Sequence, residues 1–274
     1  MGLVSLKGNT TNTHIHQLTN KTAGILTTLL SSPPSALTTH LPLIAATITH
    51  LCRISITNNG HLPTSIPPRS SHPRTSSSPL VQICHGAPGL LILLATARTQ
   101  SHLRANFWQP HWDDALRLSA SRVWDEGLLV KGGGLCHGLC GNAWALLMVH
   151  AALEADIERG LGLGVGIGPG ETQTASDDFL ARALALLLLA RECPPYSAAV
   201  GISSSFGFRL PDRPYSLFEG LAGELCAWAE ACVAIQTRLC KLGLGQGPGS
   251  VQECKGRVLG FPGLGCPVHL VRNA

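Results

Sequence analysis

The chain has 274 residues, of which 45% are hydrophobic and 13% are charged, and its formal net charge is +4 at pH 7. Such a length can bury a sizeable core, and with only 5% aromatic residues that core must depend on Leu, Ala, Val and Ile packing. This composition favours a helical globular protein, and it argues against nucleic-acid binding because cationic and aromatic residues are not interleaved.

The first part of the chain alternates polar segments with one apolar run. Residues 1–20 are polar and rich in Thr, and we predict them to be flexible. The run "NKTAGILTTLL" follows them. Prolines and serines then dominate residues 58–79, which predicts a second flexible loop, long enough to lie over a site.

A repeated unit organises the rest of the chain: Gly-x-x-Gly followed by an apolar run. The glycine pairs of its three clear copies are Gly86 and Gly89, Gly138 and Gly141, and Gly220 and Gly223. A degenerate copy precedes them, in which Gly24 matches the second glycine and Lys21 stands in place of the first. Glycines allow crowded helix starts to approach closely, and repeats of this size suit helical hairpins. We therefore predict an all-α protein, an α/α toroid of the six- or seven-hairpin type, incomplete with about four repeats.

Candidate outer helices lie between these units. Residues 113–130 and 177–192 both open with acids that favour a helix start, and residues 216–242 end in cations that favour a helix end. Residues 160–175 are rich in glycine and lack the Lys-Ser/Thr of a phosphate loop, so we predict an insertion loop there. We expect residues 1–274 to form one domain.

Two of the units begin with Cys-His-Gly, which raises the possibility of a metal site. If equivalent helix starts converge, then Cys84 from one unit meets Cys136 and His137 from the next. Two thiolates and an imidazole with a fourth position left open are typical of a catalytic zinc site. The alternative is that these cysteines only fill the core, as free cysteines often do. His85 neighbours Cys84 and is expected to line the site.

Targeting signals are weak in this sequence. The Ser/Thr-rich start resembles an organellar leader, but the first fifty residues hold only Lys7 and Lys21, too few cations for that function. The apolar run at 179–190 is too short for a membrane span and contains Arg182. We expect a cytoplasmic protein with reduced cysteines, and peripheral membrane association stays open.

Three motifs in order, "CHGAPG", "KGGGLCHGLCGNAWALL" and "RPYSLFEGLAG", resemble the C-terminal motifs of the lanthionine synthetase C-like (LanC-like) family. The resemblance implies a toroid of seven inner and seven outer helices, with zinc held by Cys84, Cys136 and His137. It further implies that Lys131 contacts glutathione, as in eukaryotic members. Such members add the glutathione thiolate to dehydroalanine or dehydrobutyrine in proteins, so the implied partners are glutathione and a protein or peptide containing a dehydroamino acid.

The chain departs from the family pattern in ways that leave its catalytic residues unknown. Asn20 and Lys21 stand where the family has the His-Gly of its acid/base histidine, Ile83 replaces a Trp, and Gly133 replaces a Tyr or similar residue. One alternative is therefore a non-catalytic scaffold that binds glutathione and zinc.

A second alternative is a glycosidase-like α/α toroid. Such an enzyme works through paired carboxylates. Asp113, Asp114 and Glu219 are the acids that would have to serve.

Overall fold

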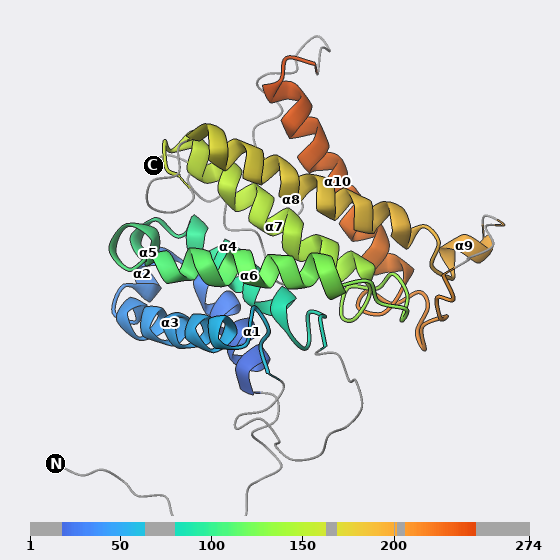
Figure 1. Cartoon of the computed structure of the whole chain (residues 1–274), viewed down its shortest axis with the longest axis horizontal. Coiled ribbons are helices and arrows are strands. Elements are labelled where there is room, and N and C mark those ends of the chain that lie inside the picture. The colour runs from blue at the N-terminus through green and yellow to red at the C-terminus, as the bar shows by residue number, and fades with distance from the viewer. Residues whose placement is uncertain (1–17, 64–79, 163–168, 200, 202–205, 245–274) are drawn as a thin grey trace, which may run out of the picture.

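A computed structural model of the chain describes residues 18–63, 80–162, 169–199, 201 and 206–244 (Figure 1). Within these ranges the chain forms ten helices and the loops between them, and its only β-type pairing is an isolated bridge between Gln82 and His85. The prediction of an all-α protein is therefore confirmed for this part of the chain.

Four helices form an inner row, in which each helix packs against the next in chain order (Figure 1). They are α1 (Leu18–Leu30), α4 (Ala87–Thr99), α7 (Leu139–Glu158) and α10 (Leu221–Lys241). The two central ones, α4 and α7, are buried on nearly every side, which explains why their sequences are apolar all round. Each of these four helices corresponds to one of the four Gly-containing repeats of the sequence.

Outer helices cover this row and complete three hairpins. The outer helices are α3 (Leu41–Thr57), α6 (Pro110–Glu126) and α8 (Pro169–Ala190). Helix α3 packs on α1, α6 on α4 and α8 on α7, while α3 and α6 lie side by side. Three short helices lie in the connections: α2 (Pro34–Leu37), α5 (Ser101–Asn106) and α9 (Tyr196–Ala199). The result is a two-layered row of hairpins; its closure into a toroid and the total number of repeats stay predictions.

The inner helices α4, α7 and α10 begin without a side-chain cap. The loop before each helix folds back instead: Leu139 N–H donates to the Gly132 carbonyl at 3.1 Å, and Leu221 N–H to the Pro214 carbonyl at 2.8 Å. These bonds satisfy donors that the first turn of a helix leaves without a partner. A Cβ on Gly141 would overlap the carbonyl oxygen of Leu135, so a larger residue there would push the loop away.

Several predicted boundaries differ from the structure. Helix α8 begins at residue 169, so the loop predicted over 160–175 is wrong for its last part. Contacts with α7 explain this, because Gln173 Nε2 donates to Glu154 Oε1 at 2.7 Å and holds the first turns of α8 in place. Helix α1 likewise begins inside the predicted flexible start of 1–20. Residues 1–17, 64–79 and 163–168 lie outside the described residues, and the flexibility expected there stays a prediction.

The helices that the structure describes differ in length and in apolar character. Not one of them combines the length and the apolar character that crossing a membrane requires.

Candidate metal centre

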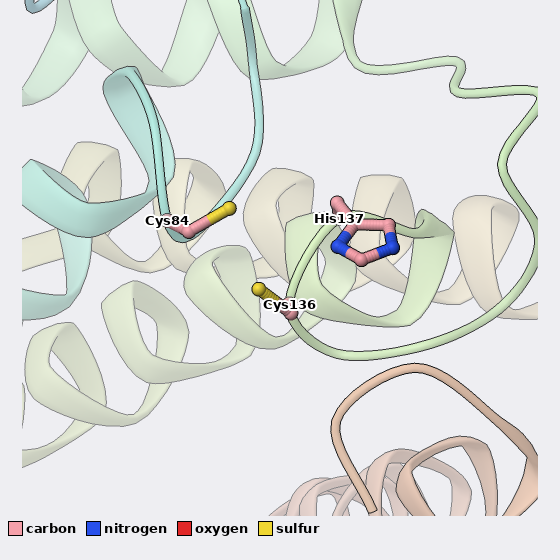
Figure 2. Close-up of side chains that lie close together, drawn as sticks. All are labelled: Cys84, Cys136 and His137. Atoms are coloured by element: carbon pink, nitrogen blue, oxygen red, sulfur yellow. The ribbon is translucent and has the colours of Figure 1, made fainter. Parts of the chain in front are cut away.

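The loops that precede α4, α7 and α10 meet at one end of the inner row. Cys84 belongs to the first of these loops, and Cys136 and His137 belong to the second (Figure 2). Cys84 N–H donates to the Cys136 carbonyl at 3.4 Å, and Cys136 N–H donates to the Phe218 carbonyl of the third loop at 2.7 Å. The backbone itself therefore fixes the three loops relative to one another.

The side chains of Cys84, Cys136 and His137 form a cluster, as the sequence predicts. One ligand atom from each, two Sγ atoms and a ring nitrogen, lie within 4.8 Å of one another, and the two sulfurs face each other (Figure 2). Zinc binds sulfur at about 2.3 Å and imidazole nitrogen at about 2.0 Å, which places tetrahedral ligands about 3.5 to 3.8 Å apart. The donor set therefore fits a zinc ion after small side-chain rotations. All three residues are only half-buried, so a further ligand has access.

The two thiols influence each other's ionisation. A hydrogen bond with Cys136 lowers the pKa of Cys84 to about 7, and Gln82 Nε2, which donates to Cys84 Sγ at 3.1 Å, acts in the same direction. The same bond between the thiols raises the pKa of Cys136, because a second negative charge beside the first is unfavourable. The pair thus holds a negative charge near neutral pH, which favours a cation between the sulfurs.

Two of the other predicted site residues lie near this cluster. Lys131 is exposed, and its positive charge lowers the pKa of both thiols. His85 is half-buried; burial is the main cause that lowers its pKa, followed by the charges of Lys131 and Lys21. Asn20, which the sequence analysis aligned with an acid/base histidine of the family, lies in the first turn of α1.

Glu224, a buried acid in the first turn of α10, was not predicted from the sequence. Its side chain is fully buried, and neither carboxylate oxygen has a hydrogen-bond partner among the described residues. Burial raises the pKa of Glu224 to about 7. The carboxyl group occupies the space that a side chain on Gly133 would need. The absence of the larger residue expected at Gly133 was the one sequence signal that could have revealed this packing.

The acids of the glycosidase alternative have other roles in this fold. Asp113 is buried, and its carboxylate accepts hydrogen bonds from Arg98 at 2.6 Å and from Trp108 Nε1 at 3.0 Å. Asp114 forms an ion pair with an arginine one turn further along α6. Glu219 lies in the loop before α10, where its charge raises the pKa of Cys136. Asp113 therefore has a structural role, and it is not free to act as one of the two catalytic carboxylates that a glycosidase needs.

The fold and the site together define a helical-hairpin protein whose inner helix starts carry a Cys-Cys-His cluster. Residues 22–157 match the family model described as lanthionine synthetase C-like protein. The chain belongs to this family, which confirms the resemblance seen in the motifs.

Two eukaryotic relatives show how much of the family the chain covers. It is 32% identical to glutathione S-transferase LANCL1 of Danio rerio over 146 residues, which are 53% of this chain and 27% of that protein. It is 29% identical to LanC-like protein GCL1 of Arabidopsis thaliana over 222 residues, 80% of this chain and 41% of the relative. The chain thus spans less than half the length of these two relatives.

Proposed function

We propose that the Cys84, Cys136 and His137 cluster binds zinc and that the protein uses it to add glutathione to dehydroamino acids in proteins or peptides. The observation that carries this proposal is the convergence of the three donor atoms within 4.8 Å of one another. The name of the Danio rerio relative, a glutathione S-transferase, supports glutathione as the thiol. A cytoplasmic location is part of the proposal, and it agrees with the finding that none of the described cysteines forms a disulfide.

The proposed reaction is a conjugate addition. When bound, zinc supplies the means to keep the glutathione thiol ionised near neutral pH. The thiolate sulfur forms a bond to Cβ of the dehydroalanine or dehydrobutyrine, the double-bond electrons move toward the neighbouring carbonyl, and a proton then adds to Cα. Lys131 binds a carboxylate of the tripeptide, because an exposed ammonium near the cluster provides a charge-assisted hydrogen bond. His85 lines the pocket beside it.

A second candidate is a protein that binds glutathione and zinc without turnover. The observation in its favour is the chain's Asn20 and Lys21, because the protonation of Cα then lacks the family's histidine. A positioned acid contributes about 10²- to 10⁴-fold to such a step. The two candidates therefore share the zinc and glutathione sites and differ only in the rate of addition.

Three measurements on the purified chain test the proposal. Elemental analysis should find about one zinc per chain in the wild type and in the matched control Cys232→Ala, whose thiol is exposed on α10, but almost none in Cys136→Ala. Calorimetry should show glutathione binding that is weaker in Lys131→Met than in Lys131→Arg. Mass spectrometry of a dehydroalanine peptide with glutathione separates the enzyme from the scaffold. Equal zinc in wild type and Cys136→Ala would contradict the site.

A further inference from the structure

Exposed apolar side chains lie on the three loops that meet at the Cys84, Cys136 and His137 cluster. We call them the apolar rim: Leu80, Leu128, Val130, Leu210, Tyr215 and Phe218. Their exposed fractions range from 42% for Leu80 to 72% for Tyr215. Exposed hydrophobic residues that occur singly need no explanation, but a group of them beside a site usually marks an interaction surface.

Hydrogen bonds join the loops of the apolar rim to one another. Arg209 N–H donates to the Val130 carbonyl at 2.9 Å, which fastens the loop before α10 to the loop before α7. The bond from Cys136 N–H to the Phe218 carbonyl, at 2.7 Å, makes the same connection beside the cluster itself. The side chain of Asn142 donates to the Val81 carbonyl at 3.0 Å and to a carbonyl just before Leu128 at 2.8 Å.

These bonds bring the three loops that carry the apolar rim together at the Cys84, Cys136 and His137 cluster. An acceptor bound at the cluster therefore lies beside loops that expose apolar side chains. A free dehydroamino acid is too small to contact several of these side chains at once. A chain segment with apolar side chains on both sides of the reacting residue can bury them together, and Tyr is well suited to such contacts because its ring is apolar and its hydroxyl is polar.

We propose that the apolar rim binds the acceptor as an extended polypeptide segment with apolar side chains flanking the dehydroamino acid. This inference rests on the proposed function, because it names the acceptor of the same site. The two reactants bind to different side chains: Lys131 binds the carboxylate of glutathione, and the uncharged rim side chains bind the acceptor. A second copy of this chain is a poorer occupant, because a partner seated on the apolar rim would cover the metal cluster and shut out both reactants.

Peptide binding can be measured without any chemistry. Short fluorescent peptides carry alanine at the reacting position, flanked either by Leu, Phe and Val or by Ser and Gln, and their binding to the whole chain is followed by anisotropy. The apolar-flanked peptide should bind about tenfold more tightly. Leu210→Ser combined with Tyr215→Ser should weaken its binding about five- to tenfold. The matched control, Leu188→Ser, removes a side chain that is 63% exposed on α8 and should change nothing.

The outcomes separate this inference from the proposed function. Equal binding of the two peptides, or an equal loss in Leu188→Ser, would overturn the inference. So would a double variant that alters only the mass measured by light scattering, because the apolar rim would then be an interface between copies. If the apolar-flanked peptide binds selectively but glutathione never adds to its dehydroalanine form, the binding surface stands and the proposed addition reaction fails.

Discussion

Replacing the buried Glu224 should remove a pH dependence from the stability of the fold. The pKa of its carboxyl group is raised from 4.5 to about 7 by burial, so the folded state keeps the proton more tightly than the unfolded chain does. The free energy of unfolding is then highest below pH 4.5 and decreases as the pH rises toward 7. One pKa unit corresponds to about 1.4 kcal/mol, so the loss over this interval is about 3 kcal/mol. The glutamine of Glu224→Gln cannot ionise, so this variant should not show that loss of unfolding free energy.

The assay is urea unfolding followed by circular dichroism at pH 5 and at pH 8. Glu224→Gln should be about as stable as the wild type at pH 5 and more stable by about 3 kcal/mol at pH 8. The control Glu158→Gln changes a carboxylate that is 64% exposed, and it should shift stability by less than about 1 kcal/mol at either pH. Parallel stability curves for Glu224→Gln and the wild type would mean that the carboxyl finds a partner when it ionises, and the argument from burial would fail.

Three further predictions concern the metal, the rate and the core. Zinc bound near neutral pH should be released progressively at acid pH, because thiolate and imidazole ligands take up protons; dialysis followed by elemental analysis measures this, and retention at pH 4 would count against Cys136 as a ligand. Asn20→His combined with Lys21→Gly should raise the rate of glutathione addition by up to about 10²- to 10⁴-fold in a mass-spectrometric assay, and an unchanged rate would show that another group donates the proton. Arg98→Met should cost about 3 to 5 kcal/mol in urea unfolding, because it leaves the buried Asp113 without its cation and removes one of the cations of the buried Asp156, whereas a loss below about 1 kcal/mol would contradict that pairing.

The inner helices were more predictable than the outer ones. Gly86, Gly138 and Gly220 mark the starts of α4, α7 and α10 because each helix needs a close backbone approach there, and that need leaves a visible pattern in the sequence. Helix α3 was not predicted, and its extent depends on packing against α1 and α6 rather than on caps. Similarly, α8 extends into the glycine-rich segment through contacts with α7 that are distant in sequence.

The same contrast holds at the candidate site. Cys84, Cys136 and His137 could be grouped from sequence because they occupy equivalent places in successive repeats, and the repeats bring equivalent places together. Glu224 could not be predicted, because its burial depends on the space left at Gly133, in another helix's loop. The repeat pattern predicts which positions lie close together in the fold. The effect of a single substitution such as Gly133 depends on which side chains of another loop or helix lie next to it, and the sequence does not show that.

The degenerate first repeat differs from the other three in structure as well as in sequence. In α4, α7 and α10 the first glycine is the residue before the helix, whereas Lys21 is the fourth residue of α1. A Cβ on Gly24 would meet no atom within 4 Å, in contrast to Gly141 and Gly223, where a Cβ would overlap a loop carbonyl. The first repeat therefore keeps Gly24 without the close backbone approach that Gly141 and Gly223 make.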